Sequence, residues 1–400
     1  MREPGLGFSA NQQVMVHPVF DNLPTTIFER MSGLARQHGA INLGQGFPDD
    51  QGPLPVREAA ARALIEGLNQ YPPMRGLPQL RAAVAGHYGR TQDLQLDPDS
   101  EIVVTSGATE ALAAAFTALI SPGDEVVLFQ PLYDAYLPLV RRAGGIPKLV
   151  TLKPPHWRFD RAMLENAFSD KTRMVVLNSP LNPAGIVTPD QDLALLAEFC
   201  VKHDVIAVCD EVWEAVVFDS RRHRPLMTFP GMRERTVKIG SAGKLFGMTG
   251  WKVGFLMAAP PLAKALAAAH QFLTFTTPPN LQAGVAWGLD NHRAWFETMP
   301  ADLQRSRDRL TAGLRVAGYV VLESQGTYFL NVDLAASGIG VDDVAFCERC
   351  VTEHGVAAIP VSAFYAESPA TTVARLCFAK ADATLDAAIE RLAAARTALL

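Results

Sequence analysis

Lys244 is the residue with the clearest capacity for covalent chemistry. It lies in the stretch Ser241–Gly254, whose members are mostly small or apolar and include no acidic residue. Desolvation of an amine, or a nearby cation such as Lys252, lowers its pKa, and a neutral amine can form an imine with an aldehyde. A surface lysine in a glycine-rich loop is the structural alternative for this segment taken alone.

Two further segments carry groups suited to an ionic ligand. Gly107, Ala108 and Thr109 follow an apolar run and begin a helical pattern, where backbone N–H groups can approach a phosphate, although any strand-to-helix turn favours such residues. Asp210 ends another apolar run, and a buried carboxylate requires a cationic partner. Glu211 is an equal candidate for the buried group, and a structural salt bridge is the alternative to a site.

An amide and a guanidinium complete the set of candidate groups. Asn182 lies between Pro180 and Pro183, in a rigid loop that would hold its side chain in one place, or in a plain turn. Arg375 lies in the middle of a predicted strand, where its planar fork suits a carboxylate. An internal ion pair is the competing interpretation for Arg375.

The elements that position these residues alternate between short apolar runs and helical patterns, which predicts an α/β fold with a mostly parallel sheet of seven strands between helices. Ligands of such sheets bind at the carboxyl ends of the strands, and the polar clusters do follow the predicted strands. Six strands are placed by sequence: 102–105, 125–129, 174–178, 205–209, 236–239 and 254–258. Two of the intervening helices are expected at 110–120 and 191–203.

A smaller α+β domain is predicted after about residue 290. Its expected elements are a helix at 293–316, strands at 319–323 and 328–332, a helix at 341–353, a strand at 373–379 and a terminal helix. The predicted division is a large domain at 46–290 and a small domain formed by 1–45 with 291–400. A length of 400 residues agrees with two domains.

Composition and net charge limit the kinds of protein and of binding partner that this sequence allows. Hydrophobic residues make up 48% and charged residues 19%, which excludes a disordered chain. The net charge of −5, with scattered Lys and Arg, argues against nucleic acid and anionic membranes. No apolar run reaches the roughly 18 residues of a membrane span. The first seven residues lack a signal-peptide pattern and the five cysteines are odd in number, so a cytoplasmic location with reduced thiols is expected.

Two local patterns favour structure over function. Cys347 and Cys350 have the spacing of a redox or zinc motif, but they fall in a helical pattern without a second ligand pair, so a helix face is predicted and no metal site. The basic run Arg221–Arg224 follows a probable strand and is predicted to be a solvated turn.

An imine-forming lysine, a phosphate cup, a carboxylate for a ring nitrogen and an arginine for a carboxylate describe a pyridoxal 5'-phosphate site for α-amino acids. The chain resembles the class I/II aminotransferases of fold type I, and is most similar to the branch with kynurenine and methionine aminotransferases. The resemblance covers about residues 41 to 380. Its most specific motifs lie at 42–49, 178–185, 241–254 and 375–380.

The resemblance implies a role for each candidate. Lys244 is expected to carry the aldimine and then move the proton between Cα and the cofactor. Asp210 would pair with the pyridinium nitrogen, Asn182 with the phenolic oxygen, and the ring of Tyr133 would stack on the pyridine. The cofactor phosphate is expected to be held by small or polar residues and one lysine: Gly107, Ala108, Thr109, Ser241 and Lys252.

The same resemblance places the substrate and a second subunit. Gly46, Asn182 and Arg375 are expected to bind the substrate carboxylate. Tyr71 is expected to reach the phosphate of a neighbouring subunit, which implies a homodimer with active sites at the subunit interface. The partners expected are therefore an amino acid, a 2-oxo acid and a second copy of the chain.

One position departs from the family pattern. Trp213 replaces the usual tyrosine after Asp210, and so removes a hydroxyl donor to the phenolic oxygen of the cofactor. Without that donor the imine nitrogen should hold its proton to higher pH, unless the indole N–H substitutes for the hydroxyl.

The expected reaction is a ping-pong transfer of the amino group of an L-amino acid to a 2-oxo acid. The segment Gln271–Thr277 is apolar and neutral, which favours aromatic, sulfur-containing or glutamine-like substrates. A cysteine-conjugate C–S β-lyase is the alternative, because the same fold supports it. N-Succinyldiaminopimelate aminotransferase also stays open, since Arg75 is available for a second carboxylate. A regulator with an aminotransferase-like body is less favoured, because only about 45 residues precede the first motif.

Overall fold

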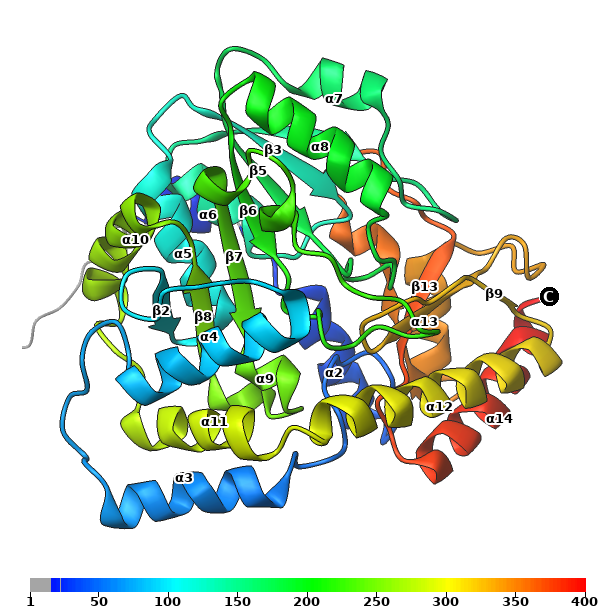
Figure 1. Ribbon diagram of the computed structural model, residues 1–400. Coiled ribbons are helices and arrows are strands. Elements are labelled where there is room, and N and C mark those ends of the chain that lie inside the picture. The colour runs from blue at the N-terminus through cyan, green and yellow to red at the C-terminus, as the bar shows by residue number, and fades with distance from the viewer. Residues whose placement is uncertain (1–15, 22) are drawn as a thin grey trace, which may run out of the picture.

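A seven-stranded sheet forms the centre of the computed structural model, which describes residues 16–21 and 23–400 (Figure 1). The strand order is β2-β8-β7-β6-β5-β3-β4, and β8 runs antiparallel to the other six strands. The strands are β2 Ile102–Thr105, β3 Glu125–Gln130, β4 Ile146–Thr151, β5 Thr172–Asn178, β6 Ile206–Asp210, β7 Thr236–Ser241 and β8 Gly254–Met257. The mostly parallel α/β architecture predicted from the sequence is confirmed.

The sheet is buried on both faces, as the β3 strand illustrates. Val126 and Leu128 pack into one hydrophobic cluster, while Val127 and Phe129 pack into a second cluster on the opposite side. Successive side chains of a strand point to opposite faces, so an unbroken apolar run is what a doubly covered strand requires.

Helices cover the two faces and one end of the sheet. α5 and α10 pack against each other near β2, β7 and β8, while α7 and α8 pack together on the side of the second cluster. The helices up to residue 291 are α1 Pro18–Asp21, α2 Ile27–Gln37, α3 Leu54–Glu66, α4 Pro78–Gln92, α5 Gly107–Leu119, α6 Tyr136–Arg142, α7 Arg161–Ala167, α8 Asp190–Lys202, α9 Ala242–Leu245, α10 Pro260–Leu273 and α11 Pro279–Asn291. Short 3-10 turns lie at Leu226–Thr228, Arg233–Arg235, Thr249–Trp251 and Val361–Phe364.

A second, antiparallel sheet lies in the C-terminal part, with the order β12-β13-β10-β9. Its strands are β9 Val320–Val321, β10 Phe329–Asp333, β12 Ile359–Pro360 and β13 Val373–Cys377, and a separate parallel pair joins β1 Ile41–Asn42 to β11 Val356–Ala357. The helices here are α12 Trp295–Val316, α13 Asp343–Thr352 and α14 Asp382–Leu399, and α12 and α14 run side by side (Figure 1). The elements expected after residue 290 are present, while the division into domains at 46 and 290 stays a prediction.

Two sequence interpretations need correction and one is confirmed. β4 was not placed, because Pro147 and Lys148 interrupt its apolar pattern and the strand lies at the sheet edge. The basic turn is only partly solvated, since the ring of His223 is buried against Glu211. The Cys347–Cys350 spacing belongs to the buried face of α13, as predicted.

The described residues contain no helix long and apolar enough to cross a membrane. The signal-peptide argument concerned residues 1–7, which lie outside the described residues.

Candidate active site

A cavity of about 170 Å³ lies where β3, β5, β6 and β7 end, at the edge that the parallel topology predicts. Strand register brings Asn178 directly beside Asp210, and a short turn after β7 carries Lys244 to the same place. The lining residues are Gly107, Ala108, Thr109, Leu112, Tyr133, Asn178, Asn182, Asp210, Val212, Trp213, Ser241, Lys244, Thr249 and Lys252. Ten of the predicted residues are therefore brought together in one cavity.

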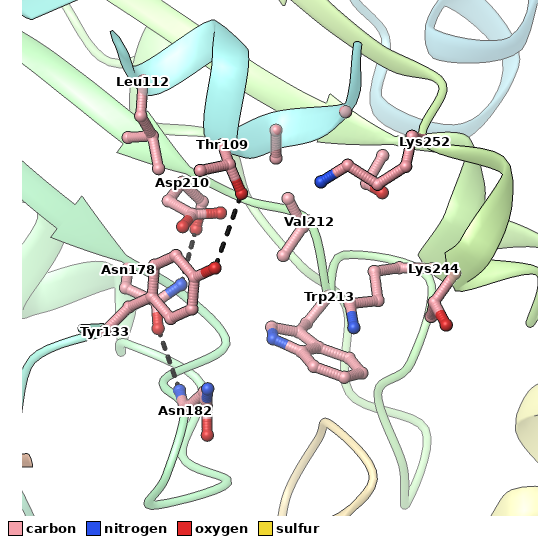
Figure 2. Close-up of a pocket in the computed structure, with 14 residues that line it drawn as sticks. Thr109, Leu112, Tyr133, Asn178, Asn182, Asp210, Val212, Trp213, Lys244 and Lys252 are labelled. Atoms are coloured by element: carbon pink, nitrogen blue, oxygen red, sulfur yellow. Dashed lines mark hydrogen bonds between the residues drawn. The ribbon is translucent and has the colours of Figure 1, made fainter. Parts of the chain in front are cut away.

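Lys244 enters this cavity from the one-turn helix α9 and is half-buried. Its pKa is lowered to about 8, mainly by desolvation and to a smaller extent by Arg375 and Lys252, while Asp210 and Cys377 oppose the shift. Its Nζ lies 4.5 Å from the ring centre of Trp213. Figure 2 shows the amines of Lys244 and Lys252 pointing into the cavity from one side and Tyr133 and Asp210 from the other. The amine has the environment predicted from its small and apolar neighbours.

The carboxylate of Asp210 lines the cavity, and one of its two oxygens is hydrogen-bonded to another residue. Oδ2 accepts a 2.6 Å hydrogen bond from the hydroxyl of Tyr136, whereas Oδ1 is buried and has no partner among residues 16–21 and 23–400. Burial raises the pKa of Asp210, and the Tyr136 hydroxyl and the backbone at Val212 counteract this rise. An unbonded buried oxygen is costly unless a donor arrives with a ligand.

Glu211 points to a separate cluster on the other side of β6. Its carboxylate contacts Lys238 and lies 2.9 Å from the ring of His223. The two acidic neighbours that the sequence left as equal candidates therefore differ in kind: Glu211 forms a structural salt bridge, and Asp210 faces the cavity.

The first turn of helix α5 forms another part of the cavity lining, with Gly107, Ala108 and Thr109. Gly107 has φ +78°, and a Cβ added there would lie 3.1 Å from Nζ of Lys252, so a glycine is needed at this turn. Glu110 accepts the backbone N–H of Ser106 at 3.0 Å and contacts the buried His270, which holds the turn in place. Backbone amides, small side chains and an ammonium group thus converge where an anion would be stabilised.

Arg375 is a fully buried cation that has no anionic partner within residues 16–21 and 23–400. Its Nη1 donates to Oδ1 of Asn182 and its Nη2 to the carbonyl of Gly44, each at 2.8 Å. Its guanidinium carbon lies 3.8 Å from the ring centre of Phe329. Burial lowers its pKa to about 9, and no ion pair among the described residues includes it. The internal ion pair considered for Arg375 is absent from the described part of the chain.

Three other candidates lie outside the cavity lining. The backbone of Gly46 packs so closely against Phe329 that a Cβ at this position would lie 2.5 Å from that ring. Tyr71 is 80% exposed and makes an edge contact with Phe275. Arg75 donates to the carbonyls of Asp99 and of Ser100, at the opposite end of β2 from Gly107.

Sequence reasoning missed Tyr136 and Asn178, both of which contact Asp210. Asn178 donates to the Asp210 carbonyl at 2.8 Å and accepts the N–H of Asn182 at 2.9 Å. Its place at the end of an apolar strand was a usable signal. Tyr136 had none, because its contact with Asp210 joins positions 74 residues apart.

The residues present fit pyridoxal 5'-phosphate. The unbonded oxygen of Asp210 suits a cationic ring nitrogen, the glycine turn with Lys252 suits a phosphate, and the desolvated amine of Lys244 suits an aldehyde. Together with the α/β sheet, this site defines a pyridoxal-phosphate-dependent enzyme of fold type I.

The comparison with known proteins gives the family. Residues 38–392 match the family model described as aminotransferase class I and II. The chain is 43% identical to methionine aminotransferase of Escherichia coli, over 96% of this chain and 99% of the relative. It is 44% identical to a probable N-succinyldiaminopimelate aminotransferase of Mycobacterium tuberculosis, over 92% and 95%.

A solved structure agrees with these sequence relatives. The crystal structure of an Escherichia coli protein with a methionine aminotransferase function superposes with a TM-score of 0.92 at 42% identity, covering 95% of this chain and all of the other. The chain belongs to the class I and II aminotransferases and is a pyridoxal-phosphate-dependent aminotransferase that acts on amino acids and oxo acids. The family expected from the sequence motifs is confirmed.

Proposed function

We propose that this enzyme transfers the amino group of an L-amino acid with an uncharged aromatic, sulfur-containing or glutamine-like side chain to a 2-oxo acid in a ping-pong cycle. The observation that carries the proposal is Arg375, a buried cation without an ion pair in the part of the chain that the structure describes, which is joined through Asn182 to the cavity of Lys244. The bound cofactor supplies an electron sink for the carbanion at the substrate Cα. The protein must then bind, orient and move a proton at that carbon.

Arg375 is proposed to bind the substrate carboxylate together with the backbone at Gly46. A buried guanidinium without an anion is costly, so a carboxylate that enters gains charge-assisted hydrogen bonds in a desolvated setting. The ring of Phe329 lies against both residues and fixes their spacing.

Lys244 is proposed as the catalytic base and acid at Cα. With a pKa of about 8, a useful fraction of the amine is neutral near pH 7 to 8, and its conjugate acid can return the proton. Trp213 covers one side of the amine and excludes water from it.

The other cavity residues are proposed to orient the cofactor. Asp210 would receive the ring nitrogen on its free oxygen, and Asn182 has its amide NH2 available for the phenolic oxygen because Oδ1 already bonds Arg375. The ring of Tyr133 would lie against the pyridine. The phosphate would be held by the residues around the start of α5 and the end of β7: Gly107, Ala108, Thr109, Ser241 and Lys252.

The side chain of the substrate is proposed to be uncharged. Lys244 and Lys252 are the cationic residues of the described cavity lining, and both are assigned to other tasks. Arg75, considered above for a second carboxylate, is engaged with backbone carbonyls instead. The methionine aminotransferase relative supports a sulfur-containing substrate. The relative with a probable N-succinyldiaminopimelate activity supports the alternative, in which the second carboxylate would need a cation from elsewhere.

The half-reaction separates these substrates. Cofactor-loaded enzyme is mixed with single amino acids, and the change of the cofactor spectrum is followed. Methionine, glutamine and aromatic amino acids should react at least tenfold faster than N-succinyldiaminopimelate. Faster reaction with the succinylated substrate would overturn the proposed class. A C–S β-lyase, the second candidate, would release pyruvate and ammonia from cysteine conjugates without any 2-oxo acid.

The covalent site has its own test. Borohydride reduction of the loaded enzyme, followed by digestion, should place the pyridoxyl mass on the peptide that contains Lys244. Lys264→Ala, on the exposed face of α10, is the matched control and should leave that mass unchanged. Absence of the mass on Lys244 would overturn the assignment.

A homodimer in the cytoplasm is the proposed state of the enzyme. Tyr71 and Phe272 are 80% and 85% exposed, and large exposed aromatic side chains are typical of interfaces. The five cysteines are buried and unpaired, which agrees with a reducing compartment. Nucleic acid is not proposed as a partner, since the net charge is −5.

Mixed dimers test the position of Tyr71. Homodimers with Tyr71→Ala and homodimers with Lys244→Ala should each be inactive, but a mixed dimer has one intact site if Tyr71 serves the neighbouring subunit. Activity above that of both parents is expected. No recovery in dimers of verified composition would mean that Tyr71 does not act across the interface.

A further inference from the structure

Tyr136 is placed to control the carboxylate of Asp210. It begins α6, it is 2% exposed, and its hydroxyl donates to Oδ2 of Asp210 at 2.6 Å. Asp210 itself is 5% exposed at the end of β6. A charge-assisted hydrogen bond between two buried side chains is among the stronger contacts available to a protein.

This bond makes the two oxygens of Asp210 unequal. The terminal torsion of an aspartate is broad, so either oxygen could face a ligand unless a partner holds one of them. Here Oδ2 is held by Tyr136, and Oδ1 is the oxygen without a partner among the described residues. The hydroxyl therefore selects which oxygen is available to the cavity.

Tyr136 also contacts the residue proposed to lie against the cofactor ring. The rings of Tyr133 and Tyr136 meet edge to face, with centres 5.6 Å apart. Both residues lie between the end of β3 and the first turn of α6. Tyr136 thus contacts both Asp210, which is proposed to bind the ring nitrogen, and Tyr133, which is proposed to stack on the ring.

We propose that Tyr136 is a positioning residue that acts through Asp210, holding one carboxylate oxygen so that the other meets the cofactor ring nitrogen as an anion. The inference rests on the role of Asp210 given under the proposed function. Burial favours the protonated acid, and the hydroxyl of Tyr136 opposes this by bonding the anion. Without that hydroxyl, the Asp210 carboxylate becomes more basic. The proton between the cofactor ring nitrogen and Asp210 would then lie closer to Asp210.

The test compares two cofactors on the full-length apoenzyme, with the change in absorbance or fluorescence as the readout of binding. One cofactor is pyridoxal phosphate, and the other is its analogue with carbon in place of the ring nitrogen. Tyr136→Phe should weaken binding of pyridoxal phosphate about 10- to 100-fold, the range for a lost hydrogen bond to a charged group. Binding of the analogue should change less than about twofold, because it has no nitrogen for Asp210 to meet.

Three controls fix the interpretation. Tyr319→Phe removes another buried hydroxyl, which bonds the Leu392 carbonyl, and it should leave both affinities unchanged. Replacement of Tyr136 by 3-fluorotyrosine keeps the donor and should retain the wild-type affinity for pyridoxal phosphate, even if Tyr136→Phe fails to fold. Asp210→Asn should weaken pyridoxal phosphate more than the analogue.

The outcomes separate two failures. Equal weakening of both cofactors by Tyr136→Phe, or loss of affinity with 3-fluorotyrosine, would reduce Tyr136 to a packing residue and overturn the inference. If Asp210→Asn weakens both cofactors equally, the proposed role of Asp210 fails first.

Discussion

Two desolvated lysines, Lys238 in strand β7 and Lys244 in the turn that follows it, show what distinguishes a reactive site from a structural one. Lys238 contacts Glu211 and Glu214, and although desolvation lowers its pKa, the two carboxylates outweigh this and raise it. For Lys244, desolvation outweighs the opposing effects of Asp210 and Cys377 and lowers the pKa to about 8. Burial therefore makes a lysine nucleophilic only where nearby carboxylates do not outweigh the cost of desolvating the ammonium group.

The carboxylates of Glu211 and Asp210 differ in the same way as the two lysines. Lys238 and His223 outweigh desolvation at Glu211 and bring its pKa to about 2, whereas Asp210 has a raised pKa and one oxygen without a partner in the described part of the chain. In the structural cluster, the ammonium of Lys238 pairs with the carboxylates of Glu211 and Glu214. In the site, the amine of Lys244, Oδ1 of Asp210 and the guanidinium of Arg375 are available to bind ligands.

The largest expected effect breaks the structural cluster. Lys238→Met leaves Glu211 and Glu214 buried without their cation, which should lower the free energy of unfolding by about 3–5 kcal/mol. Lys244→Met in the apoenzyme removes an amine that carries a desolvation cost, so its effect should stay below about 1 kcal/mol. Denaturant and thermal unfolding of the two apo variants check this. Equal destabilisation by both substitutions would contradict the comparison.

A second prediction compares two buried arginines. Arg375→Gln should reduce the second-order rate constant of the amino-acid half-reaction by about 30- to 1,000-fold, because truncation of a buried charge that binds a carboxylate costs 2 kcal/mol or more. Arg307, which bonds both oxygens of Asp219, is the matched control. Arg307→Gln should lower the thermal midpoint and leave that rate constant within about twofold. A similar kinetic loss in both variants would count against the substrate role.

The pH dependence of cofactor binding sharpens the assignment of Lys244. The amine is protonated below its pKa of about 8, so the rate at which the apoenzyme combines with pyridoxal phosphate should rise about tenfold per pH unit below pH 7 and level off near pH 8 to 9. Stopped-flow absorbance between pH 6 and 10.5 measures it. A rate that keeps rising to pH 10.5 would mean an ordinary lysine.

The smallest expected effect concerns Trp213. Its ring lies 4.5 Å from the Lys244 amine, and an aromatic face stabilises a nearby cation. Trp213→Tyr replaces the indole and returns a hydroxyl donor, so the pH midpoint of the visible absorbance of the loaded enzyme should fall by up to about one unit. Wild type and variant are titrated in parallel, and an unchanged or higher midpoint would show that the indole already supplies the missing donor.

Much of the site was predictable because its chemistry is local in sequence. Lys244, Asp210 and Asn182 each follow a short apolar run or occupy a rigid loop, and parallel strands bring such positions to one edge. The edge strand β4 was missed, since a strand that is half exposed carries a weak apolar pattern.

The amino-acid sequence by itself determined the α/β class, the family and the set of groups that can do chemistry, because apolar periodicity and local motifs are properties of neighbouring residues. Only the tertiary structure decided between Asp210 and Glu211, left Arg375 without an ion pair among the described residues, and placed Tyr136 against Asp210. Those outcomes depend on which face of a strand a side chain takes and on what distant segment lies opposite, and electrostatic balance is set by such neighbours in space.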